Sequence, residues 1–220
     1  MYFSKISFDA TNHWQRMVKV LNQKLYQEHR MIWSFFPGDK EAKRDFLYRR
    51  EDKANVPFFY LLSGRKPVSD DPLFIIQTQS FLPKLEEGDH LQFSLRANAV
   101  KSYKVDESKR RVRKDIVQVK KESYQQDELP PLEHIRYEAG WEWLEQQGEK
   151  GGFTVNSLAV ENHQVHQFSK EKNAKQRTFA SLDFSGVLQV SDVLVFEKVL
   201  FNGLGRSKAF GCGLFLVRRI

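Results

Sequence analysis

Apolar and polar residues alternate over residues 2–8, which predicts a β-strand at the N-terminus. Over Asn12–Phe36 the apolar residues return at steps that fit one face of a helix, and a Pro-Gly pair at 37–38 ends this pattern. Asn22 is a candidate break into two shorter helices. Strand patterns separated by glycine and proline turn signals follow at Phe46–Arg50, Phe58–Ser63, Phe74–Phe81 and His90–Val100.

The second half of the chain shows a similar order of elements. A helical pattern over Leu132–Gln147 begins after two prolines, a favoured start, and the glycines that follow end it. A short helix is expected over Ser191–Phe201, ahead of a final strand at Leu214–Val217. Further strands are expected at Ile116–Val119, Val155–Val160 and Thr178–Val190.

Each half therefore has the order strand, helix, two strands, a weaker helix or turn, and strand. This order predicts an α+β protein made of two tandem ferredoxin-like (RRM-like) βαββαβ domains, at residues 1–90 and 91–220. The pattern for a second helix in the first half, near residues 67–74, is weak. The two halves share no sequence repeat, so the duplication rests on element order alone.

The charge of the chain favours a polyanionic partner. Lys and Arg number 35 against 28 Asp and Glu, which gives a formal net charge of +7. Charge alone does not choose between nucleic acid, an anionic membrane and solubility. Cys212 is the only cysteine, which excludes an intrachain disulfide and favours a reducing, cytoplasmic setting. No apolar run approaches the roughly 20 residues of a membrane span, so no membrane partner is expected.

The segment Gly203–Gly213 combines four glycines with two cations. Glycine allows close approach and positive φ, so backbone N–H groups there can point at phosphate oxygens. The alternative is a helix C-cap followed by a tight turn. A dinucleotide site is disfavoured because the predicted helix precedes the glycines and the strand follows them. The residues of this segment that we expect to contact RNA are Gly203, Gly205, Arg206, Ser207, Gly211 and Gly213.

Basic residues gather in two further stretches of the second half. Arginine pairs with phosphates and stacks on bases, which suits structured RNA. The alternative for such a charge run is a solvated hairpin. Three basic regions in one half favour RNA, and the residues proposed to bind it are Arg96, Lys101, Lys104, Arg110, Arg111, Arg113, Lys114, Lys170, Lys172, Lys175 and Arg177.

Tyr26 and His29 lie three residues apart on the expected helix, so they share a face. Histidine titrates near neutrality and is the usual proton-transfer group. His29 also lies near the apolar stripe of the helix, so a core role is the alternative. His163 and His166 have a metal-like spacing, but no acidic or cysteine cluster completes a site. Neither a metal nor another cofactor is expected.

Taken together, several segments resemble a known family. They are Met1–Lys5, the run from Leu25 to Trp33 with Phe36-Pro37, the mid-chain Arg96–Lys101, and Gly203–Gly213 ahead of the last strand. The chain is similar over essentially its whole length to the CasE endoribonucleases, the CRISPR repeat-processing subunits of type I-E Cascade complexes.

The resemblance implies two ferredoxin-like domains, with the catalytic helix in the first and the basic segments and glycine-rich loop in the second. It implies binding of a CRISPR repeat hairpin and metal-independent cleavage at the 3′ base of the stem, leaving a 2′,3′-cyclic phosphate and a 5′-hydroxyl. The expected partners are this pre-crRNA or crRNA hairpin and the other Cascade subunits, without DNA contact by this subunit alone. The family's catalytic histidine falls on His29 and the tyrosine beside it on Tyr26.

For the chemistry, His29 is expected to act as general base or acid, Tyr26 to position the phosphate or the 2′-hydroxyl, and Lys208 or Arg206 to stabilise developing charge. The alternative function is a non-catalytic RNA-binding subunit of a ribonucleoprotein complex.

Overall fold

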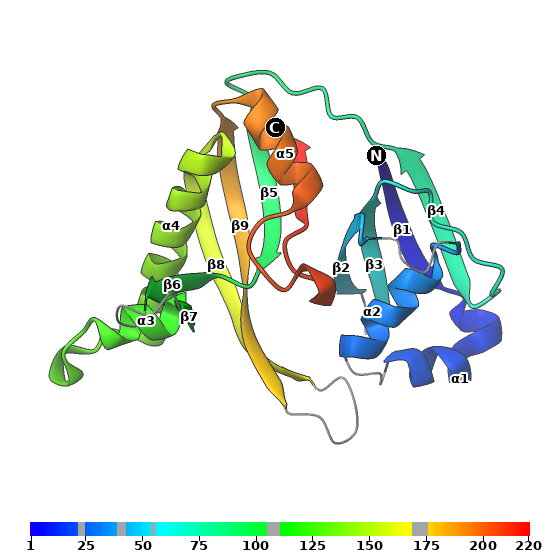
Figure 1. Cartoon of the computed structure of the whole chain (residues 1–220), viewed down its shortest axis with the longest axis horizontal. Helices are drawn as coiled ribbons and strands as arrows, with labels where there is room; N and C mark the ends of the chain where they lie inside the picture. Colours follow the sequence, from blue (N-terminus) through cyan, green and yellow to red (C-terminus); the bar gives the residue numbers. More distant parts are fainter. Residues whose placement is uncertain (22–24, 39–42, 54–55, 105–110, 169–175) are drawn as a thin grey trace.

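The computed structural model describes residues 1–21, 25–38, 43–53, 56–104, 111–168 and 176–220. Two four-stranded antiparallel sheets lie side by side, each with its own helices (Figure 1). The connection between them, from the end of one sheet to the start of the other, crosses the top of the molecule in this view. Among the described residues, no helix has the length and apolar character needed to cross a membrane.

The first sheet has the strand order β2-β3-β1-β4, with β1 and β3 in the centre. This is the order of a ferredoxin-like unit. The position between β3 and β4, residues 64–73, forms bends and turns in place of a second helix, in keeping with its weak helical pattern. The elements of this half are β1 (Tyr2–Phe8), α1 (Ala10–Leu21), α2 (Leu25–Ser34), β2 (Phe46–Lys53), β3 (Val56–Ser63) and β4 (Phe74–Ser80).

The alternating pattern of β1 explains how α1 and α2 pack on one face of this sheet. Ile6 and Phe8 point to the helices, where they join a core with Ile32 and Phe35 of α2. The region of the long helical pattern contains α1 and α2, and the candidate break at Asn22 lies outside the described residues. One face of the sheet is therefore covered by helices.

The second sheet has the order β10-β5-β9-β8, again that of a ferredoxin-like unit. A two-stranded hairpin, β6 and β7, and helix α3 are inserted after its first strand. The predicted fold class is confirmed. The elements are β5 (His90–Ala97), β6 (Val100–Lys104), β7 (Arg111–Asp115), α3 (Ile116–Glu122), η1 (Gln126–Glu128), α4 (Leu132–Gly151), β8 (Phe153–Phe168), β9 (Arg177–Val190), α5 (Val193–Asn202), η2 (Lys208–Phe210) and β10 (Phe215–Arg219).

One predicted element has the wrong type. Ile116–Val119 was expected as a strand but begins helix α3. The Asp115 carboxylate accepts hydrogen bonds from the N–H groups of Val117 and Gln118, which caps the helix. Ile116 and Val117 are buried in the core of the second half. Capping and burial together override the strand preference of these β-branched residues.

Helix α4 ends where a residue must adopt a left-handed conformation. Gly152 has φ 70°, and a Cβ atom there would lie 2.5 Å from the carbonyl oxygen of Asp192. The helix was predicted to end at Gln147, but it continues to Gly151 and ends at this glycine, with Gly148 inside it. The close packing lets α5 start directly beside the end of α4.

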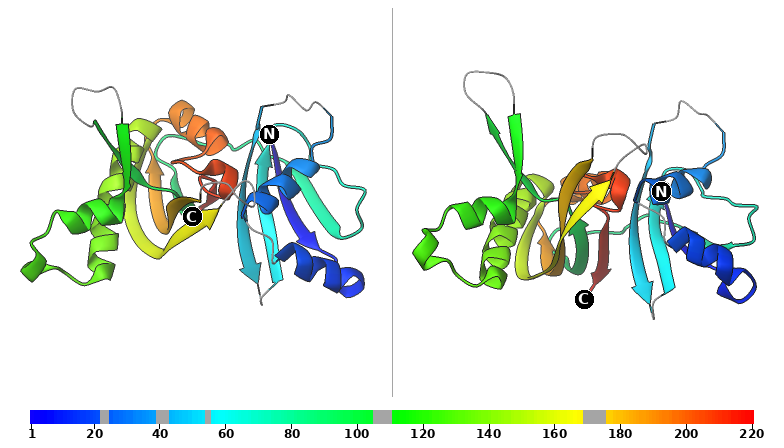
Figure 2. Two further views of the ribbon diagram at one scale, coloured as in Figure 1. Left: turned by 60° about the horizontal axis from the view of Figure 1, so that its bottom comes forward. Right: turned by 90° about the horizontal axis from the view of Figure 1, so that it is seen from below.

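Apolar and polar contacts join the two halves, which Figure 2 shows from two further directions. Leu47 and Leu62 of the first sheet pack with Leu214 of the second half. The buried Arg49 donates to the hydroxyl oxygen of Ser94 at 3.0 Å. The first sheet ends at Ser80 and the second begins at His90. The domain division at residues 90 and 91 stays a prediction.

Candidate functional site

His29 lies on α2, with its ring among aromatic side chains from both halves. Trp33, one turn further along the helix, donates its indole N–H to His29 Nε2 at 3.0 Å. The ring centroids of Phe46 and Phe210 lie 6.1 and 6.2 Å from that of His29. Because Nε2 accepts a hydrogen bond, the proton of the neutral imidazole belongs on Nδ1. His29 Nδ1 is buried and has no hydrogen-bond partner among the described residues.

The surroundings of His29 favour its neutral form. Burial lowers the pKa of His29, and the positive charge of Arg44 lowers it further. The histidine is therefore mostly uncharged near neutral pH. A neutral imidazole is chemically suited to exchange a proton with a substrate. In this structure Nε2 accepts from Trp33 and Nδ1 is buried, so such an exchange requires one of the two nitrogens to be uncovered.

Tyr26 lies one turn before His29 on the same helix and is half-buried. It has no hydrogen-bond partner within the described chain. Between the two residues, Glu28 is buried and its carboxylate lies 2.5 Å from Nη1 of Arg50 on β2. Burial raises the pKa of Glu28, whereas the hydrogen bond from Arg50 opposes the rise. This pair fixes the side of α2 that is turned toward β2.

The short helix η2 of the glycine-rich segment packs against α2 and β2, so it brings the second half to His29. The Tyr48 hydroxyl on β2 donates to the carbonyl oxygen of Ala209 at 3.1 Å. From the other side, Asn98 Nδ2 donates to the Ser207 hydroxyl oxygen at 2.5 Å. Ser207 has φ 52°, an uncommon conformation for a residue with a side chain. The turn is thus held by residues from both halves.

Lys208 is the first residue of η2 and is half-buried. Burial lowers the pKa of Lys208, and the charge of Arg44 lowers it further. Arg44 therefore acts on both His29 and Lys208, which brings three nitrogen-bearing side chains together. Burial also lowers the pKa of Arg44, which forms no ion pair with a described carboxylate. Two half-buried cations without a carboxylate between them suit a bound anion.

The glycines of this segment have a clear structural role. Gly203, Gly205, Gly211 and Gly213 all have positive φ, and a Cβ atom on Gly213 would lie 2.7 Å from the carbonyl oxygen of Leu204. Several N–H groups of the segment already donate within the chain, so they are not free for phosphates. Those donors are the N–H groups of Gly203, Leu204, Arg206, Phe210 and Gly213. The tight-turn alternative therefore accounts for the glycines, and their contact with RNA stays a prediction.

Arg96 was predicted to bind RNA, but its guanidinium is held within the chain. It forms two hydrogen bonds with the Asp183 carboxylate, at 2.7 and 2.8 Å, and donates to the carbonyl oxygen of Arg50 at 3.2 Å. Arg96 thus links the second sheet to β2 of the first. Arg206 is exposed, and its backbone N–H donates to the carbonyl oxygen of Asn98 at 3.3 Å.

The β6–β7 hairpin carries most of the other basic residues that were predicted to bind RNA and that the structure describes. It projects from the body of the second half (Figure 2). Its register pairs Lys104 with Arg111, and Ser102 with Arg113, so these three cations share one face. Lys101 and Lys114 pair on the other face, where Lys114 lies 2.8 Å from Glu122. Arg177 is exposed at the start of β9, whereas Arg110, Lys170, Lys172 and Lys175 lie outside the described residues.

His163 and His166 do not meet at a common site. His163 Nε2 lies 3.1 Å from Asp115, and His166 Nε2 lies 2.7 Å from the Ser181 hydroxyl. No group of three metal-binding side chains occurs among the described residues.

Sequence reasoning missed Arg44 and the residues that hold η2. Arg44 had one signal, a basic residue two positions before β2, whose first residue Phe46 lies beside His29. The roles of Tyr48 and Asn98 had none, because their partners lie 161 and 109 residues away.

Comparisons with known proteins agree with this fold. A family described as CRISPR associated protein matches residues 1–219. The chain is 29% identical to the CRISPR system Cascade subunit CasE of Escherichia coli K12 over 222 residues, 97% of each chain. It is also similar to the structure of the CRISPR endoribonuclease Cse3 bound to a 19-nucleotide RNA, with a TM-score of 0.72, 21% identity and coverage of 99% of this chain and 100% of that one. A further similar structure is Cas6e from Escherichia coli K-12, with a TM-score of 0.66, 22% identity and full coverage of both chains. The chain therefore belongs to the CRISPR-associated protein family, and the resemblance to CasE is confirmed.

Proposed function

We propose that this protein is a metal-independent endoribonuclease that binds the stem-loop of a CRISPR repeat and cleaves pre-crRNA at the 3′ base of the stem. The observation that carries this proposal is the contact of His29, from the first half, with Phe210, from the second, at 6.2 Å between ring centroids. Lys208 belongs to the same short helix as Phe210, and the charge of Arg44 lowers the pKa of both His29 and Lys208. The names of the relatives support the proposal, since one is a Cascade subunit and another an endoribonuclease bound to RNA.

The proposed chemistry uses the RNA's own nucleophile. The 2′-oxygen loses its proton and attacks the adjacent phosphorus, the bond from phosphorus to the 5′-oxygen breaks, and that oxygen takes up a proton. The products are a 2′,3′-cyclic phosphate and a 5′-hydroxyl. His29 exchanges one of these protons, while Lys208 and Arg44 stabilise the charge that develops on the phosphate oxygens. Tyr26, on the same helix face, positions the phosphate or the 2′-hydroxyl.

The proposed RNA path includes the exposed cations of the β6–β7 hairpin. Lys104, Arg111 and Arg113 lie on one face of an arm that stands away from the body, so they can reach phosphates of a stem bound beside it. We propose that the product stays bound and is delivered to the other subunits of a Cascade complex, as expected for a protein similar to the Cascade subunit CasE.

The test is cleavage of the cognate repeat RNA in EDTA, with and without a 2′-deoxy substitution at the scissile nucleotide. Cleavage is expected in EDTA and is expected to disappear with the deoxy substitution, because the nucleophile is then missing. A requirement for magnesium, or cleavage of the deoxy substrate, contradicts the proposed mechanism. The control is hairpin binding, which the deoxy substitution at one nucleotide leaves nearly unchanged.

A second function, a non-catalytic RNA-binding subunit, is favoured by one observation. His29 Nε2 is already occupied by Trp33, and the ring is packed among aromatic side chains, as a core histidine is. Tight binding of the repeat hairpin without cleavage, under the conditions above, supports this alternative.

A further inference from the structure

The first sheet leaves one of its faces without helices. Helices α1 and α2 pack on the face that contains Ile6 and Phe59, and both lie on the same side of the sheet (Figure 2). Side chains alternate along each strand, so Phe3, Lys5, Phe58 and Tyr60 point to the opposite face. We call this the open face; it looks toward the second half, and Phe3 and Tyr60 border the apolar cluster that joins the two halves.

Aromatic rings line this open face on the two central strands. Phe3 on β1 and Tyr60 on β3 have ring centroids 5.6 Å apart and planes inclined by 25°. Phe58 lies next along β3, with its centroid 5.2 Å from that of Tyr60. All three rings are partly exposed. In the RNA-recognition fold, aromatic side chains on the open face of a four-stranded sheet stack against the bases of single-stranded RNA.

The polar groups beside these rings suit a nucleic acid. Lys5 is the only charged residue in β1, β3 and β4, and its Nζ lies 4.9 Å from the Phe58 ring centroid. The register places Gln79 beside Phe3 and Gln77 beside Lys5. An amide side chain offers donors and an acceptor to a base edge, and the ammonium group offers a countercharge to phosphate.

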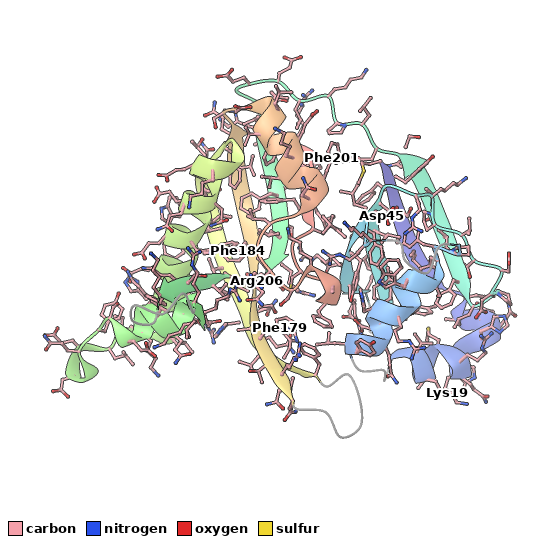
Figure 3. All side chains as sticks on the ribbon, viewed as in Figure 1. Lys19, Asp45, Phe179, Phe184, Phe201 and Arg206 are labelled. Atoms are coloured by element: carbon pink, nitrogen blue, oxygen red, sulfur yellow. The ribbon has the colours of Figure 1, made fainter. Side chains whose placement is uncertain are left out.

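The space above the rings is a groove between the two halves. A cavity of about 310 Å³ is lined by Phe3, Tyr60 and Phe81 from the first half and by Leu214 and Leu216 from the second. A shallower hollow of about 250 Å³ continues it over Lys5, Gln77 and Gln79. Figure 3 shows Phe201 of α5 directed toward the first half, where its ring centroid lies 6.3 Å from that of Phe81. The groove is thus apolar at one end and polar at the other.

We propose that this open face, the platform formed by Phe3, Lys5, Phe58, Tyr60, Gln77 and Gln79, binds unpaired nucleotides of single-stranded RNA by stacking their bases on its rings. The site is distinct from the candidate catalytic site, because α2 and His29 lie over the opposite face of the same sheet. It extends the proposed function but does not depend on cleavage. β1, β3 and β4 contain no acidic residue. On β2, Glu51 lies opposite Phe58 on this face, and its carboxylate is 2.5 Å from Nε of Arg49.

The test uses a fluorescently labelled oligouridylate of about 12 nucleotides, a length within the range that sheet-based single-strand sites cover. Tyr60→Leu and Phe58→Leu keep an apolar side chain but remove the ring, and each is expected to weaken binding by roughly 5- to 150-fold. Lys5→Ala is expected to lower the log–log slope of affinity against salt by about 0.7. The matched control is Tyr137→Leu, an exposed tyrosine on α4, which is expected to bind like the unaltered protein.

Two experiments separate RNA binding by the β6–β7 hairpin from RNA binding by the platform. The loss caused by Tyr60→Leu is expected to persist in a chain that also carries Arg111→Ala and Arg113→Ala. Photo-crosslinking of a 4-thiouridine oligonucleotide is expected to label the peptide that contains Phe58 and Tyr60. Thermal unfolding of each variant checks that the fold is retained.

Three outcomes overturn the proposal. The first is unchanged RNA affinity in the folded Tyr60→Leu and Phe58→Leu variants. The second is an equal loss of RNA affinity in Tyr137→Leu. The third is normal RNA affinity of the Tyr60→Leu and Phe58→Leu variants together with failure to assemble with the other Cascade subunits, which makes the face a protein-docking surface. None of them depends on the EDTA and 2′-deoxy assay of the hairpin, so failure of the platform and failure of the proposed cleavage are distinguishable.

Discussion

Two basic regions of this protein hold their charges in different ways. Lys208 and Arg44 are half-buried beside His29, and burial lowers the pKa of both. Lys104, Arg111 and Arg113 are exposed on the arm formed by β6 and β7. The turn that carries Lys208 is held by hydrogen bonds from both halves of the molecule, through Tyr48 and Asn98.

This difference separates two uses of positive charge. A cation fixed in a partly buried site acts on one position of a bound substrate and is screened little by salt. Exposed cations on an arm contribute to attraction of a polyanion at many positions, and salt weakens them strongly. We therefore expect the residues around His29 to set the cleavage rate and those of the β6–β7 hairpin to set the affinity for the repeat RNA.

The largest expected effect is that of His29→Ala on cleavage. Loss of a general acid or base typically lowers a rate by about 10²–10⁴-fold, whereas affinity for the hairpin is expected to change little. Single-turnover cleavage and equilibrium binding of the same repeat RNA measure the two quantities. If affinity falls as far as the rate does, His29 is a structural residue of α2 and the proposed separation fails.

The second effect is that of Lys208→Ala, which removes a cation from the site but none from the hairpin. A stabilising group directed at developing charge contributes about 10²–10³-fold to a rate. We expect single-turnover cleavage to fall by that order, with a smaller change in affinity than Arg111→Ala produces. Lys198→Ala is the matched control, since Lys198 is a lysine on α5 outside both basic regions. An equal loss of rate in the control means that general charge, rather than placement, accounts for the effect.

The β7 variants Arg111→Ala and Arg113→Ala are expected to affect affinity more than the cleavage rate. Each is expected to weaken binding of the repeat RNA and to lower the log–log slope of affinity against salt by about 0.7–0.9 for every phosphate that the variant no longer neutralises. The single-turnover rate at saturating protein is expected to stay nearly constant. Lys114→Ala is the internal control, because Lys114 lies on the other face of the hairpin and already pairs with Glu122. An unchanged salt slope in both arginine variants would place this face of the hairpin away from the RNA.

Much of this architecture could be predicted from the chain, because local pattern and fold agree in most elements. The alternation in β1 and the helical pattern of α4 both reflect a face that is buried in the structure. Ile116–Val119 shows the limit of that approach. Its β-branched residues favour a strand, and the deciding contacts come from the Asp115 cap and the packing against α4.

The site was less predictable than the fold. His29, Tyr26 and Lys208 were candidates by residue type and by resemblance, but their surroundings depend on contacts between distant segments. Arg96 illustrates the difficulty, since a basic residue in a basic protein suggests RNA binding, yet its guanidinium pairs with Asp183. Sequence alone does not distinguish a paired arginine from a free one.

The smallest expected effect concerns the pH dependence of cleavage, and it tests how His29 is held. The Trp33 indole donates to His29 Nε2, and a hydrogen bond to the neutral imidazole disfavours its protonated form. Trp33→Phe removes this donor and is expected to raise the pKa of His29 toward its ordinary value. The variant keeps an aromatic ring beside Phe46, whose centroid lies 5.1 Å from that of Trp33.

The limb of the pH–rate profile that moves, acidic or basic, identifies the role of His29 as well. If His29 acts as a base, the rate of the unaltered protein falls as the pH drops through its lowered pKa, and if it acts as an acid, the rate falls as the pH rises through it. In either case Trp33→Phe moves that limb of the pH–rate profile to higher pH. Titration of the His29 ring by NMR measures the same pKa without activity. A limb that stays in place while the ring pKa rises means that His29 does not exchange the proton in cleavage, which would return the site to the simpler role of binding RNA.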